Sequence, residues 1–151
     1  MRFVRFLAPC AAFLLFFSCG ETPVDPADFG TRPLTLPNGK TIRVEVMSRM
    51  EDMARGMMFR ESLAPDRGML FIHASPGLQK YWMYQVKISL DIVFIGPNRR
   101  IVEISANTPP CTTKASDCPT FGGAVPSQFV LELAAGEAAR NGLSPGQTIV
   151  F

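Results

Sequence analysis

Short apolar runs, each bounded by turn-forming residues, constrain the fold of this chain more than any other feature of its sequence. The runs are too short for typical helices, and they are rich in the β-branched and aromatic residues that favour strands. Glycine, proline and asparagine separate them, as in Gly96-Pro97-Asn98. Runs of this kind predict strands at residues 69–72, 81–86, 90–95, 101–105, 129–133 and 148–151.

A β-hairpin and a short C-terminal helix add to this pattern. Residues 34–36 and 41–46 alternate between apolar and polar side chains on either side of Asn38-Gly39, a typical hairpin turn. Residues 134–142 favour a short helix, because they end in Asn141-Gly142, a common helix stop.

A second helix is expected near residue 48. Ser48 and Glu51 fit a capping box. Residues spaced for one buried helical face follow, namely Met50, Met53, Ala54 and Met57. Together the elements predict one α+β domain of seven to eight short, mostly antiparallel strands and two short helices, arranged as a β-barrel or a sandwich.

The first residues have the composition of a secretory signal. Arg2 and Arg5 precede an apolar run over residues 7–17, which is shorter than the roughly 20 residues needed to cross a bilayer. We therefore expect a signal peptide at 1–18, a proline- and acid-rich tether at 19–33, and one globular domain at 34–151.

Cys19 follows the signal at the position where a bacterial lipoprotein is cleaved and acylated. Ser18 and Gly20 suit that role, although Phe16 stands where leucine is usual. The sequence thus predicts a periplasmic or cell-surface lipoprotein whose partner is the membrane, through a lipid anchor on Cys19. Ordinary cleavage, which would give a soluble secreted protein, is the alternative.

The remaining cysteines and the charge balance fit an exported domain. Cys111 and Cys118 can persist as a disulfide in an oxidising compartment. Without Arg2 and Arg5, the 15 basic residues become 13, equal to the 13 acidic ones. A neutral domain lacks the basic surface that binds phosphate backbones, so we expect no nucleic-acid partner.

Several stretches resemble the domain of unknown function 192 (DUF192) family, small prokaryotic proteins of which many are exported. They are ARGMMFR (54–60), GMLF (68–71), WM (82–83), LDIVFI (90–95), NTPPC (107–111) and FVLEL (129–133). One departure is clear, since family members often carry Lys-Asn-Thr where this chain has Tyr84-Gln85-Val86. The resemblance implies a compact, β-rich domain but no particular reaction.

Metal binding has little support in the sequence. His73 is the only histidine, and pairing of Cys111 with Cys118 removes the thiolates, so we predict no zinc site and no cofactor. Methionines crowd residues 47–58, and thioethers are soft ligands that select Cu(I). Core packing along the predicted helix is the simpler interpretation of these methionines.

Two carboxylates stand inside apolar strands. Asp91 and Glu132 must each find a partner, lie at a strand end or take up a proton, because an unpaired buried carboxylate is costly. Arg55 and Arg60 are the arginines expected to pair with them. Alternatively, these four residues and Trp82 form a cleft for a small polar ligand.

Catalysis is not indicated by any specific motif. The sequence has no Gly-x-Ser-x-Gly elbow, no free cysteine and no phosphate-binding glycine loop, and Gly122-Gly123 is expected to be a loop hinge. The sequence favours a non-catalytic envelope domain that binds a small polar ligand or a partner protein. A weak hydrolase using Asp91 and Glu132, or methionine-based Cu(I) binding, are the alternatives.

Overall fold

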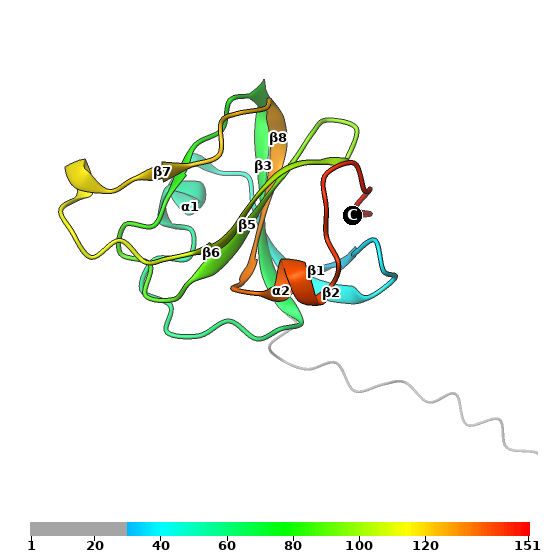
Figure 1. The fold of residues 1–151 in the computed structure, drawn as a ribbon, viewed down its shortest axis with the longest axis horizontal. Helices are drawn as coiled ribbons and strands as arrows, with labels where there is room; N and C mark the ends of the chain where they lie inside the picture. Colours follow the sequence, from blue (N-terminus) through cyan, green and yellow to red (C-terminus); the bar gives the residue numbers. More distant parts are fainter. Residues whose placement is uncertain (1–29) are drawn as a thin grey trace, which may run out of the picture.

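The computed structural model describes residues 30–151, and the predicted signal, Cys19 and most of the predicted tether lie outside this range. A six-stranded sheet in the order β1-β2-β3-β8-β5-β6 forms its centre (Figure 1). The strands are β1 (Thr31–Thr35), β2 (Thr41–Met47), β3 (Arg67–Gly77), β5 (Leu90–Ile95), β6 (Ile101–Thr108) and β8 (Ser127–Ala134). Because β1 begins at Thr31, residues 31–33, predicted as tether, belong to the sheet.

The sheet is mixed and does not close. All neighbouring pairs are antiparallel except β2 and β3, which run parallel on either side of helix α1 in the chain. The ladder ends at β1 and β6, so the predicted barrel is wrong, whereas the α+β class and the dominance of strands are confirmed. Residues 148–151, predicted as a strand, make only isolated bridges, Thr35 with Val150 and Arg100 with Thr148.

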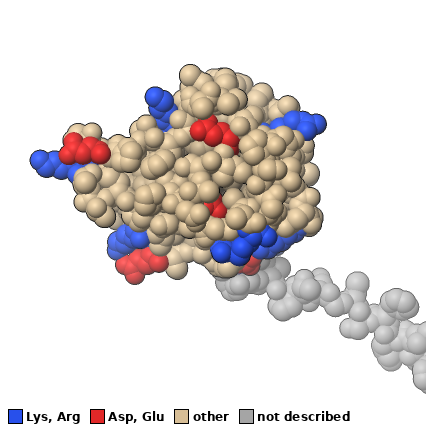
Figure 2. All heavy atoms as spheres, in the orientation of Figure 1, with Lys and Arg blue, Asp and Glu red and all other residues tan. Residues whose placement is uncertain are grey.

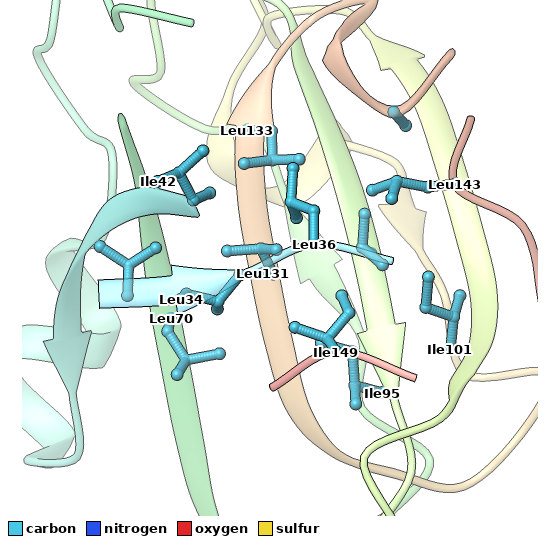
Figure 3. Packing of buried hydrophobic residues seen from close by; sticks show 13 residues of the cluster. Leu34, Leu36, Ile42, Leu70, Ile95, Ile101, Leu131, Leu133, Leu143 and Ile149 are labelled. Carbon is cyan, nitrogen blue, oxygen red and sulfur yellow. The ribbon is translucent and has the colours of Figure 1, made fainter. Parts of the chain in front are cut away.

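Both faces of the sheet are covered, which explains why every residue of β5 is buried. On one face, leucines and isoleucines of the β1–β2 hairpin pack against Leu131 and Leu133 of β8 and against the C-terminal segment around Leu143 and Ile149 (Figure 3). On the other face, α1 and the segment around β4 lie over a second cluster that includes Met57, Met69 and Ile92. We call these the C-terminal face and the α1 face.

The helices are shorter than predicted. Helix α1 spans Met50–Arg55 and has Arg49 as its N-cap residue without a side-chain hydrogen bond, so the capping box at Ser48 is wrong. Met50 is 82% exposed. Of the four residues predicted to form a buried helical face, only Met57 is fully buried, and it lies beyond the end of the helix. Helix α2 covers only Glu137–Arg140 of the predicted 134–142.

A small second sheet projects from the α1 face. It pairs β4 (Tyr81–Trp82) with β7 (Thr120–Phe121), so only the first two residues of the predicted strand 81–86 form a ladder. The disulfide between Cys111 and Cys118 and a 3-10 helix, η2 (Ala115–Asp117), precede β7. Gly122 is not simply a hinge, because a Cβ there would lie 2.1 Å from the ring of Phe94.

No helix within residues 30–151 is long and apolar enough to cross a membrane.

Candidate functional site

Glu132 is the central residue of the candidate site. It lies on β8 opposite Met69 of β3 and Ile92 of β5, and therefore points to the α1 face of the sheet. Its side chain is only 5% exposed. Its Oε2 atom has no hydrogen-bond partner within the described part of the chain. A buried carboxyl oxygen in this state normally costs folding free energy, so it requires an explanation.

A cavity of about 40 Å³ lies against Glu132, between the sheet and the segments that cover it. Thioethers and aromatic rings dominate its walls. They come from α1 and the turn after it, from β3, and from the β4 segment: Met53, Ala54, Arg55, Gly56, Met57, Met58, Phe71, Tyr81, Trp82, Tyr84 and Val86. The cavity thus combines mostly apolar walls with the buried carboxyl group of Glu132.

The electrostatics of Glu132 follow from this placement. Burial raises the pKa of its carboxyl from 4.5 to about 8, and the nearby Arg60 guanidinium opposes that rise only in part. Arg60 is engaged elsewhere, because its Nη1 and Nη2 donate to the two carboxylate oxygens of Glu45 at 2.6 and 2.7 Å. This bidentate pair neutralises the Arg60 guanidinium and raises its pKa.

Aromatic contacts hold one wall of the cavity in place. The ring of Tyr81 packs edge-on against Phe71 and Phe94, at centroid distances of 5.2 and 5.9 Å. Its hydroxyl lies 3.0 Å from Nε2 of His73. Burial, with a contribution from Glu132, raises the pKa of Tyr81, so the phenol stays neutral at physiological pH.

The outer wall is held by the disulfide segment. Trp82 pairs with Thr120 of β7, and Tyr84 forms a bridge with Cys111, whose backbone N–H donates to Met83. The rings of Trp82 and Tyr84 lie 5.3 Å apart. Trp82 is 42% exposed, so its ring also meets the solvent.

A second, more open hollow of about 360 Å³ adjoins the cavity. The two share Arg55, Gly56 and Met58. The hollow also contains polar groups, including Asp52 of α1 and the Glu45–Arg60 pair. We call the cavity at Glu132 the inner compartment and this hollow the outer compartment.

Asp91 does not belong to this site. It lies opposite Leu133, so it points to the C-terminal face, whereas Glu132 points to the α1 face. Its two oxygens accept hydrogen bonds from the backbone N–H groups of Asn107 and Ala138, both at 2.7 Å. The predicted arginine partner for Asp91 is therefore wrong, and a catalytic pair of Asp91 and Glu132 is not formed.

The structure thus brings together four of the five predicted ligand-binding residues. Arg55, Trp82 and Glu132 line the inner compartment, and Arg60 lies close enough to affect the charge of Glu132. Arg60 nevertheless bonds to Glu45, not to Glu132 as expected from the sequence.

Sequence reasoning missed two groups of residues in the site. The sequence offered little indication that Glu45 belongs to the site, because a charged residue is ordinary at a polar position of an alternating strand. Tyr84 and Val86 gave a stronger one, since both stand where the chain departs from the family pattern, and both line the inner compartment. The departure therefore replaces polar side chains by an aromatic and an aliphatic one beside Glu132.

The described residues contain no cluster of three or more His, Cys, Asp or Glu side chains that could hold a metal ion. Three thioethers, those of Met53, Met57 and Met58, do share the walls of the inner compartment.

Comparison with known proteins adds relatives but no activity. The model of the DUF192 family, described as an uncharacterised ACR, matches residues 34–151. A crystal structure of a protein of unknown function from Novosphingobium aromaticivorans DSM 12444 is 34% identical, with a TM-score of 0.72, over 80% of this chain and 85% of that one. A Sinorhizobium meliloti 1021 protein, described as a candidate transcription regulator, is 31% identical, with a TM-score of 0.69, over 78% of this chain and 89% of that one. No curated protein matches the chain.

Proposed function

The chain belongs to the DUF192 family, and we propose that its domain is a non-catalytic binding module of the cell envelope that holds a small polar ligand at Glu132. One observation carries this proposal. A carboxyl group that is 5% exposed faces a cavity, and one of its oxygens has no hydrogen-bond partner among residues 30–151. A ligand that supplies the missing partner would offset the cost of burying that group.

Binding fits the site better than catalysis does. A hydrolase that uses two carboxylates needs both of them in one cleft, flanking the bond that is cleaved, and Asp91 lies on the opposite face of the sheet from Glu132. His73 hydrogen-bonds to Tyr81 and does not line the inner compartment. Glu132 remains the single buried carboxyl group in the cavity wall as the structure describes it.

The surface of this chain does not favour nucleic-acid binding, which the description of the Sinorhizobium meliloti relative as a transcription regulator would suggest. Charged side chains of both signs are dispersed over the face shown in Figure 2, with no broad basic patch there. The charge balance of the exported part of the sequence likewise argues against a nucleic-acid partner.

A thermal-shift screen tests the proposed function. Small amines, acids, amides, sugars and metal ions are screened against the purified protein, the Glu132→Gln variant and a control, Glu51→Gln, which alters an exposed carboxylate on α1. We expect at least one compound to stabilise the wild type and the control but not Glu132→Gln. A hit that stabilises all three proteins equally places the site elsewhere and contradicts the proposal.

Cu(I) binding is a second candidate, favoured by the three methionines that line the inner compartment. Anaerobic Cu(I) titration of the wild type and of Met57→Leu separates it from the first. Binding tighter than about micromolar that Met57→Leu abolishes would support copper, and its absence would remove this candidate.

The envelope location of the module rests on the sequence. We propose acylation of Cys19, followed by a short tether that ends where β1 begins. Cys19→Ser should move the protein from the membrane to the soluble fraction. If the wild-type protein is already soluble after export, the lipid anchor is wrong.

A further inference from the structure

We propose that the inner compartment binds a primary alkylammonium group, whose N–H donors reach the unpartnered oxygen of Glu132. This inference rests on the proposed function and adds the chemical class of the ligand. Four properties of the site favour this ligand, namely the missing donor, the aromatic wall, the pairing and placement of the nearby arginines, and the size of the cavity.

The missing partner of Glu132 must be a donor once the carboxyl group is ionised. A primary ammonium carries three N–H donors and a full positive charge, so it satisfies the free oxygen and the buried charge together. A hydroxyl group supplies the hydrogen bond but leaves the negative charge uncompensated. Charge therefore distinguishes the proposed ligand from a neutral one of the same shape.

The walls of the inner compartment suit an alkylammonium ion. Phe71, Tyr81, Trp82 and Tyr84 contribute aromatic rings, which attract cations through their negative faces. The thioethers of Met53 and Met57 and the side chain of Val86 offer apolar contacts for the carbon atoms of the ligand. The surroundings thus match both ends of a short aliphatic amine.

The arginines near the site do not donate a hydrogen bond to the free oxygen of Glu132. Both terminal nitrogens of Arg60 are bound to Glu45. Arg55 is exposed and lies at the boundary between the two compartments. Arg55 is therefore placed to meet an anionic group on the same ligand, outside the inner compartment.

The size of the cavity selects a small head group. A volume of about 40 Å³ exceeds the roughly 10–15 Å³ needed to hold one water molecule, but it is small compared with an ordinary ligand pocket of about 300–1,000 Å³. This is enough for an NH₃⁺ group and one or two carbon atoms, whereas a trimethylammonium group is too bulky. The rest of the ligand must extend into the outer compartment.

Matched small probes test the inference by NMR titration of the purified protein. Ethanolamine should bind with an affinity near 1 mM, which is the range expected for four non-hydrogen atoms. Ethylene glycol, which replaces the ammonium by a hydroxyl, and choline, which replaces it by a trimethylammonium, should each bind at least tenfold more weakly. O-phosphoethanolamine should bind more tightly than ethanolamine, and Arg55→Gln should remove only that gain.

Two variants link the binding to the inner compartment. Glu132→Gln should weaken ethanolamine binding by about 10- to 100-fold, the range expected when a hydrogen bond to a charged group is lost. Met53→Phe should fill part of the cavity and block the amine without changing the carboxyl group. Equal binding of ethanolamine to wild type and either variant would overturn the inference.

The same head group occurs on free amines and on ethanolamine lipids. Co-sedimentation with vesicles of phosphatidylcholine, with and without phosphatidylethanolamine, distinguishes these sources when Cys19→Ser protein is used. Vesicle binding that requires phosphatidylethanolamine and Glu132 indicates the lipid, and binding of the soluble probes alone indicates a free amine.

The outcomes also separate this inference from the proposed function. If no amine binds but another compound from the thermal-shift screen requires Glu132, the binding module stands and the ammonium is wrong. If ethylene glycol binds as well as ethanolamine, the ligand is neutral and the inference fails. If nothing binds in a Glu132-dependent way, both proposals fail.

Discussion

The burial of Glu132 predicts an unusual dependence of stability on pH. The pKa of its carboxyl rises from 4.5 to about 8 on folding because burial disfavours the charged form. Between these two values the folded state keeps a proton that the unfolded state releases. The contribution of Glu132 to stability is therefore fully present below about pH 4.5 and is lost as the pH rises through about 8.

The size of this loss follows from the difference between the two pKa values. A difference of about 3.5 pH units corresponds to about 5 kcal/mol at 1.36 kcal/mol per unit. Only 5% of Glu132 is exposed, so solvent screening does not reduce this figure substantially. It is comparable to the lower end of the total stability of a small domain, about 5–15 kcal/mol. Glutamine at this position keeps the shape of the side chain but has no titration to lose.

Urea unfolding of wild type and Glu132→Gln, followed by circular dichroism, measures the effect. The difference in unfolding free energy between the two proteins isolates Glu132, because the other titrating groups are common to both. We expect the variant to gain about 5 kcal/mol relative to wild type between about pH 4 and pH 9. A difference that stays constant over this range would refute the reasoning, since it would mean that Glu132 titrates normally.

Other predictions concern the supports of the site and the pH dependence of binding. Asp91→Asn should lower the unfolding free energy by about 2–4 kcal/mol in urea titrations. One of its two charge-assisted hydrogen bonds is lost, and an amide N–H of the new side chain then faces a backbone N–H. Asp117→Asn, at an exposed position, serves as the control, and equal effects of the two substitutions would contradict the structural role of Asp91. The Cys111→Ser, Cys118→Ser double variant should lose about 2–3 kcal/mol by the loop-entropy estimate for a separation of 7 residues, and calorimetry should show it. The same variant should bind ethanolamine more weakly, since Tyr84 pairs with Cys111, and unchanged affinity would show that the wall stands without the disulfide. Ethanolamine affinity should rise by up to tenfold per pH unit towards about pH 8 and then level off, because the ammonium requires an ionised Glu132. Arg60 keeps its charge because its pKa is raised, and the raised pKa of Tyr81 and the lowered pKa of His73 keep both neutral around pH 8. An affinity that already falls between about pH 8 and pH 9, before an alkylammonium group loses its own proton at about pH 10, would contradict binding to the ionised carboxyl group.

The positions of most strands could be predicted from the sequence because apolar runs and turn residues are local features. The central strand β5, for example, coincides with its predicted range, 90–95. The pairing of β2 with β3 in parallel could not, since it depends on how the chain crosses over through α1. Local patterns also predicted helices longer than those observed. Met50, for example, fits the spacing of a buried helical face and is nevertheless exposed.

The two buried carboxylates show where sequence reasoning stops. Asp91 and Glu132 look alike in sequence, since each interrupts an apolar strand. Their roles differ because the register places Asp91 opposite Leu133 and Glu132 opposite Ile92, on opposite faces of the sheet. The partners of Asp91 are backbone N–H groups, which have no signature in the sequence.

The short α1 helix explains why a cavity exists on that face at all. It has six residues and none of them is buried, so it cannot cover the sheet as a longer amphipathic helix would. Met57 and the rings of the β4 segment complete the cover, and the space left between them lies against Glu132. An apolar residue at position 132 would remove a cost of about 5 kcal/mol above pH 8. A side chain that lowers stability by this amount, where packing favours an apolar one, is expected at a functional site. The stability measurements on Glu132→Gln and the binding measurements on the same variant therefore test one idea from two sides.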